Sequence, residues 1–118
     1  MVPVAAVGRE TRGSCDAVGM PEFEVVIARA DLMNEEDFRR IRVGLPADRQ
    51  ERCDAYYRDR DRYSSAVSYA LLQYLWRERW SGPMPAIERA AYGKPRFSRR
   101  PEVEFNWSHD AGICVGAM

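Results

Sequence analysis

The apolar positions of the chain form short runs that predict a mixture of strands and helices. Phe23, Val25 and Ile27 alternate with Glu24 and Val26, which is typical of a strand. Between residues 61 and 80, apolar side chains recur at i, i+3, i+4, i+7 and i+8, a spacing that predicts one long helix with a single stripe facing a core. Ser81-Gly82-Pro83 follows that stripe and predicts the end of the helix.

Shorter elements surround the long helix. We expect one helix over residues 32–42 and another that begins at Pro46, where the missing N–H has no cost, and runs to about Tyr57. Residues 83–102 are rich in proline and predict loop, with a short strand near Ile87. Two strands are then expected, at 103–107 and 113–117. The sequence therefore predicts an α+β fold, in which the long helix packs across one face of a small, mostly antiparallel sheet.

Length and composition predict one small globular domain. The chain has 118 residues, of which 46% are hydrophobic and 31% charged. Residues 1–20 lack periodicity and are expected to form a flexible N-terminal tail, so the domain should span residues 21–118. The chain stops at Met118, directly after an apolar run and without a turn signal. We therefore expect one half of a larger fold, with an uncovered apolar face that could drive self-association.

Charge and cysteine usage exclude several classes of function. Lys plus Arg and Asp plus Glu both number 18, and this balance argues against nucleic acid or an anionic membrane as partner. No apolar run approaches the roughly 20 residues that span a bilayer. Three widely spaced cysteines and one histidine do not predict a disulfide framework or a zinc site. Reduced thiols indicate a cytoplasmic location.

Tyr92-Gly93-Lys94-Pro95 is the first cluster whose residue types could bind a ligand. Gly93 would let a ligand approach the backbone, Lys94 offers a charge suited to phosphate, and Pro95 gives a flat apolar surface for a base. An ordinary surface turn bounded by glycine and proline is the alternative.

Residues 105–109, Phe-Asn-Trp-Ser-His, form the second cluster. In a strand, Phe105 and Trp107 would share the core face, and Asn106 and Ser108 the other. We expect the chain to turn at His109, which would place a hydroxyl and an imidazole at a strand end, where they could contact phosphate. The alternative is a core strand that ends in a histidine whose ring nitrogens are hydrogen-bonded within the protein. A serine hydrolase is disfavoured, because no Gly-x-Ser-x-Gly elbow is present.

Arg49 and Arg52 form a third feature. Their spacing of three places both guanidinium groups on one side of the helix that starts at Pro46, where they could clamp a terminal phosphate. The alternative is a solvated helix face.

Together these clusters resemble one family. Their order, from Leu45-Pro46 and the two arginines through a long Leu-rich helix to Gly93-Lys94-Pro95 and the Phe-Asn-Trp-Ser-His strand, is similar to the N-terminal half of the larger, surfactin-synthetase-activating type of 4′-phosphopantetheinyl transferase. The similarity covers residues 23–118. This family moves the phosphopantetheine arm of coenzyme A onto a serine of an acyl or peptidyl carrier protein.

The resemblance implies roles for particular residues. Arg49, Arg52 and His109 are expected at the 3′-phosphate of coenzyme A, with Ser65 of the long helix as a further candidate. Gly93, Lys94 and Pro95 should lie along the adenine, and Ser108 at the diphosphate. Where the family often has arginine this chain has Ser64, and Arg62 is the candidate to replace that charge.

The resemblance also implies what is missing. The family continues beyond this point with a pair of carboxylates that hold Mg²⁺ and with a base for the serine proton, whereas residues 110–118 contain a single carboxylate, that of Asp110. We therefore expect no catalytic and no metal-binding residues in this chain. Two hypotheses follow: an N-terminal fragment of a transferase that binds coenzyme A without catalysing transfer alone, or a non-catalytic coenzyme A- or nucleotide-binding module that acts with or without a separately encoded second half.

Overall fold

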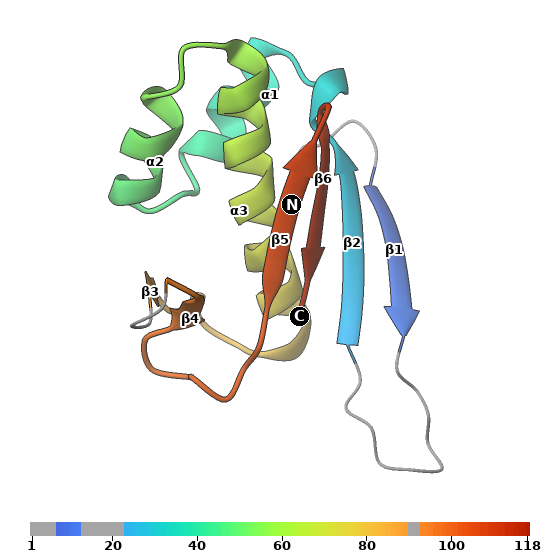
Figure 1. The fold of residues 1–118 in the computed structure, drawn as a ribbon, viewed down its shortest axis with the longest axis vertical. Coiled ribbons are helices and arrows are strands. Elements are labelled where there is room, and N and C mark those ends of the chain that lie inside the picture. The colour runs from blue at the N-terminus through green and yellow to red at the C-terminus, as the bar shows by residue number, and fades with distance from the viewer. Residues whose placement is uncertain (1–6, 13–22, 90–92) are drawn as a thin grey trace.

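The computed structural model describes residues 7–12, 23–89 and 93–118, and they form an α+β fold (Figure 1). Four strands make one antiparallel sheet in the order β1-β2-β6-β5, and two short strands make a separate hairpin. The bounds of the strands are β1 Val7–Arg12, β2 Phe23–Arg29, β3 Ile87–Arg89, β4 Pro95–Phe97, β5 Asn106–Asp110 and β6 Ile113–Ala117. The helices are the short 3₁₀ turn η2 Ala30–Leu32, α1 Glu35–Arg42, α2 Ala47–Asp54 and α3 Asp59–Arg79. The predicted fold class is confirmed.

The long helix α3 packs on one face of the sheet and carries much of the core. Val26 and Ala28 of β2 and Cys114 of β6 are buried against it. Gly116 of β6 lies so close to the helix that an added Cβ would meet the Leu71 Cβ at 3.1 Å, and the missing side chain therefore permits this approach. In Figure 1, α1 and α2 lie beyond α3, away from the sheet.

The opposite face of the sheet is partly exposed. Phe23 and Ile27 of β2 are 39% and 38% exposed, and Ile113 of β6 is 42% exposed. The strand predicted around residues 23–27 is confirmed, but its buried side is the one that carries Val26 and Ala28. Alternation could not identify this side, because apolar residues occupy both faces of β2.

Several predicted boundaries are corrected. Residues 1–20 were expected to form a tail, yet Val7–Arg12 form β1, which pairs antiparallel with β2; the rest of that range lies outside the described residues. The first helix begins at Glu35 because Asn34 forms a capping box with Asp37. The strand expected at 103–107 runs over Asn106–Asp110.

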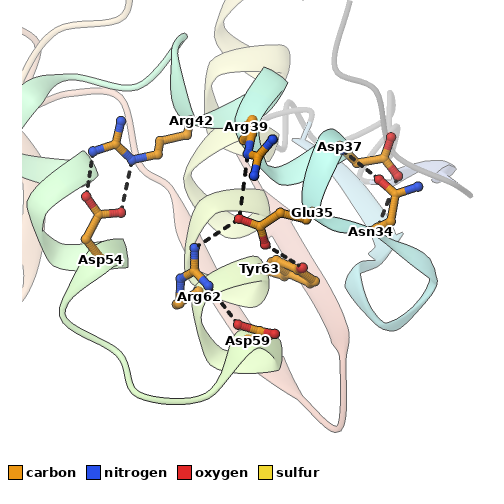
Figure 2. Close-up of polar contacts among 9 residues, drawn as sticks. All are labelled: Asn34, Glu35, Asp37, Arg39, Arg42, Asp54, Asp59, Arg62 and Tyr63. Atoms are coloured by element: carbon orange, nitrogen blue, oxygen red, sulfur yellow. Dashed lines mark hydrogen bonds and ion pairs between the residues drawn. The ribbon is translucent and has the colours of Figure 1, made fainter.

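One arginine ion pair, drawn in Figure 2, and two hydrogen bonds from a glutamine fix α2 relative to α1. Arg42 of α1 forms a bidentate ion pair with Asp54 of α2, with Nε–Oδ1 and Nη2–Oδ2 distances of 3.0 and 2.5 Å. The Gln50 side chain of α2 donates to the carbonyls of Arg42 and Leu45, both at 3.0 Å. Cys53, on the same helix, is fully buried. These contacts hold α2 in one orientation on α1 and α3.

Five aromatic rings form a continuous row from the end of α3 to β5. The row runs through Trp80, Trp76, Phe97, Phe105 and Trp107, with neighbouring centroids 4.4, 5.4, 4.3 and 5.6 Å apart. An arginine lies over each end: Arg100 over the ring of Trp80, and Arg49 over the ring of Trp107. This row joins the β3–β4 hairpin to the sheet and to α3.

None of the helices in the described part of the chain has the length and apolar character needed to cross a bilayer.

Candidate functional site

A cleft of about 270 Å³ lies where α2, α3, the β3–β4 hairpin and β5 meet, and we call it the arginine cleft. Its described lining combines three arginines, one aspartate and a set of apolar or aromatic side chains. The lining residues are Pro46, Asp48, Arg49, Arg52, Tyr69, Ala86, Ile87, Arg89, Pro95 and Trp107. With three positive charges and one negative charge, the described lining has a formal charge of plus two.

Arg49 is the most enclosed of the three arginines. Its guanidinium carbon lies 5.0 Å from the centroid of the Tyr69 ring and 5.9 Å from that of Trp107. Burial lowers the pKa of this guanidinium from its ordinary value, and the buried Nε has no hydrogen-bond partner among the described groups. A partly desolvated cation with an unused donor gains most from an anion placed against it.

Arg52 and Arg89 extend the positive lining toward solvent. Arg52 lies one helical turn after Arg49 and makes no ion pair within the described residues. Arg89 ends β3, and its Nη1 donates to the carbonyl of Gly93 at 2.7 Å. Guanidinium groups bind phosphate oxygens through paired N–H donors, so the arrangement suits a phosphorylated ligand.

The structure brings three of the predicted site residues into this one cleft. Arg49 and Arg52 come from α2, and Pro95 from β4. Lys94 is exposed and lines a neighbouring hollow of about 350 Å³, which shares Pro95 as a wall. Gly93 has a φ of 82° and open space around it, so its backbone is accessible as predicted. Tyr92 lies outside the described residues.

Other predicted site residues do not line the arginine cleft. Ser65 is buried in α3 beneath α2, where its hydroxyl accepts a hydrogen bond from the Cys53 thiol at 3.4 Å. Ser108 lies on the face of β5 that is turned away from α3, as the alternation of the strand predicted. A buried serine with a protein partner is a poor candidate for a phosphate contact.

His109 differs from the prediction in its backbone. We expected the chain to turn at this residue, but β5 continues to Asp110 and the turn follows at Ala111 and Gly112, whose φ angles are 51° and 82°. His109 is exposed on the same side of β5 as Trp107, about 7 Å further along the strand. It therefore lies beside the cleft without lining it.

Arg62 was the candidate to replace the arginine that the family often has at the position of Ser64. Its guanidinium contacts Asp59 at 2.7 Å and Glu35 at 3.4 Å, and it lies 4.6 Å from the centroid of the Phe38 ring (Figure 2). These contacts place Arg62 at the junction of α1 and α3, and it is not among the described residues that line the arginine cleft.

Tyr69, Arg89 and Trp107 are cleft residues that the sequence did not identify. Trp107 was expected in the core, and it does continue the aromatic row, but its ring also reaches the cleft. Tyr69 lies outside the apolar stripe that defined α3. Arg89 lines the cleft only because Phe97 packs the hairpin against Trp76 of α3 and Phe105, a tertiary arrangement that has no local signal.

The described residues offer no metal centre. No group of three or more His, Cys, Asp or Glu side chains gathers as ligands within them. They therefore do not fit the Mg²⁺ that the resemblance implies, and we derive no chemical step through that ion.

Comparison with models of known protein families gives no match for this sequence, and comparison with curated proteins gives none.

Proposed function

We propose that this chain binds coenzyme A in the arginine cleft and is the N-terminal half of a 4′-phosphopantetheinyl transferase of the larger type. One observation carries the proposal: Arg49, Arg52 and Pro95, which the resemblance assigned to one ligand, line one cleft although Pro95 lies more than forty residues after both arginines in the sequence. Sequence spacing alone gives no reason for that convergence.

The chemistry of the cleft supports this ligand. Coenzyme A carries a 3′-phosphate, a diphosphate and an adenine at one end. Three guanidinium groups suit the phosphates, while Ile87, Pro95 and Trp107 offer apolar and aromatic surface for the base. Lys94 lines the neighbouring hollow, where it would contact a ligand that extends past Pro95.

In this proposal the chain contributes binding, and a second half contributes the chemistry. The Mg²⁺ ligands and the base that accepts the serine proton come from that half, and the acceptor is an acyl or peptidyl carrier protein. The proposal places the reaction in the cytoplasm, a reducing compartment that suits the free, buried thiols of Cys53 and Cys114.

A second candidate function is a non-catalytic module for coenzyme A or another 3′-phosphorylated nucleotide. It is favoured by the lining itself, whose described residues pair no nucleophile with a base. Both candidates use the same cleft. They differ in whether a second half converts the bound coenzyme A into a donor for a carrier serine.

Calorimetry with coenzyme A tests what the two candidates share. Arg52→Ala should weaken binding by about 10-fold or more, since a charge-assisted hydrogen bond to phosphate contributes about 1.5–3 kcal/mol. Arg99→Ala is the matched control, because Arg99 is exposed and lines no described part of the cleft. Equal affinities of the two variants, or no binding by the unaltered chain, would contradict the proposal.

Mass spectrometry of an apo carrier protein separates the candidates. The chain with coenzyme A and Mg²⁺ should leave the carrier unmodified, and addition of a C-terminal half from a transferase of this type should produce the holo form. Modification by the chain alone would show that the chemistry does not need a second half.

A further inference from the structure

The β3–β4 hairpin carries two arginines whose side chains have different environments. In the register of the hairpin Arg89 pairs with Pro95 and Ile87 with Phe97, and these four residues share one face. Arg96 lies on the other face, where its Nε contacts the Glu88 carboxylate at 3.2 Å. Because Phe97 is fully buried and Pro95 lines the arginine cleft, the Arg89 face is the one turned toward the cleft.

Arg89 is held in place without losing its charge. One N–H of its guanidinium donates to the backbone carbonyl of Gly93 at 2.7 Å, which ties the side chain to the loop end of the hairpin. No carboxylate forms an ion pair with it among the described residues, whereas Arg96 is paired. A guanidinium has five N–H donors, so a single backbone contact leaves most of them for a ligand.

The charge of the cleft indicates which phosphate is bound. Arg49 and Arg52 approach from α2, Arg89 approaches from the hairpin, and Asp48 is the one described acid in the lining. A net charge of plus two matches a phosphate monoester, which carries close to two negative charges at neutral pH, better than a single diester oxygen.

We propose that Arg89 is a third phosphate ligand of the arginine cleft, and that together with Arg49 and Arg52 it recognises a phosphate monoester. This inference rests on the proposed function, which already expects Arg49 and Arg52 at the 3′-phosphate, and it adds a residue that the motifs did not contain. It also gives the β3–β4 hairpin a role in binding: the hairpin supplies the cation that faces α2 across the cleft.

Binding of two ligands to two charge-removing variants tests the inference. Coenzyme A has the 3′-phosphate monoester and dephospho-coenzyme A lacks it. Arg89→Gln should weaken binding of coenzyme A by about 10-fold and leave the affinity for dephospho-coenzyme A within about 2-fold, because only the monoester contact is lost. Arg96→Gln, which removes the same charge from the other face of the hairpin, should leave both affinities unchanged.

The outcomes separate this inference from the proposed function. If the unaltered chain binds neither ligand, the proposed function fails. If it binds coenzyme A and Arg89→Gln binds both ligands as the unaltered chain does, or loses affinity for both equally, the role of Arg89 at the monoester is wrong while the cleft remains. Arg89→Lys keeps one positive charge, so its preference for coenzyme A should lie between those of the unaltered chain and Arg89→Gln. A preference no greater than that of Arg89→Gln would indicate that the arginine only shapes the hairpin.

Discussion

At the level of single residues, the turn between β5 and β6 packs tightly against the segment that precedes α1. Gly112, in the turn between β5 and β6, has a φ of 82°, and a Cβ built there would lie 2.6 Å from the Cβ of Asp31. The amides of Ala30 and Asp31 both donate to the Gly112 carbonyl, at 2.7 and 3.2 Å. The missing side chain therefore allows the sheet turn to contact the segment that leads into α1.

Gly112→Ala should destabilise the fold through two separate effects. The left-handed backbone costs an alanine about 1–2 kcal/mol, and the clash with Asp31 should add a further ~1–3 kcal/mol. Gly82→Ala is the control, since Gly82 has the same φ of 82° with nothing within 4 Å. Urea denaturation of both variants measures the difference, and equal losses of unfolding free energy would show that the turn can move away from Asp31.

At the scale of elements, the position of α2 decides whether the arginine cleft exists. The ion pair between Arg42 and Asp54 joins α1 to α2, and the hydrogen bond from Arg42 holds the pKa of Asp54 below its ordinary value of 3.8. A carboxylate with a lowered pKa in the folded state stabilises the fold above the pKa of the unfolded state. That contribution is lost as the pH falls through the folded-state pKa.

Asp54→Asn should therefore reduce stability at neutral pH and have little effect in acid. The unfolding free energies of the variant and the unaltered chain should differ at pH 7 and converge only as the pH falls through the lowered pKa of Asp54 in the folded state. Glu51→Gln, a change on the same helix at a carboxylate without an ion pair among the described residues, should show no such convergence. Denaturation midpoints at both pH values provide the measurement, and a difference that persists in acid would show that the ion pair does not determine the pH dependence.

The elements were largely predictable from the sequence, and the site only in part. The apolar stripe around Leu71 identified α3. The helix is nevertheless buried on more than one side, since residues 64–72 are all buried between the sheet and the helices α1 and α2. β2 was placed correctly but its buried side was not, since Val26 and Ile27 are equally apolar. Arg49 and Arg52 could be placed on one face from their spacing. Arg89 could not be assigned to the cleft, because its position depends on how Phe97 packs the hairpin against α3 and Phe105.

For the whole molecule, the distribution of apolar surface is uneven. All described helices lie on one side of the sheet (Figure 1). The alternation of β2 and β6 places Phe23, Ile27 and Ile113 on the other side, where they are partly exposed. Ile27 is adjacent to Val115 across the β2–β6 pair, so these side chains belong to one continuous surface. A contiguous apolar face on a small domain favours association with another surface of the same kind.

The unaltered chain should therefore self-associate as its concentration rises. The double variant Ile27→Thr, Ile113→Thr should remain monomeric, because threonine keeps the strand preference while its hydroxyl makes the face more polar. Val43→Thr is the control, as Val43 is 76% exposed and lies after α1, away from this face. Sedimentation velocity over a concentration series gives the result, and a monomer at every concentration would contradict the expectation.

The pairing of β2 with β6 affects how the arginine cleft forms during folding. These two strands lie about ninety residues apart along the chain, so their union depends on slow loop closure rather than on local propensity. Every residue that lines the arginine cleft, from Pro46 to Trp107, lies within the loop that this pairing closes. Opening of one strand pair at the centre of the sheet would therefore release the entire enclosed segment, and the lifetime of the cleft is tied to the lifetime of that pair.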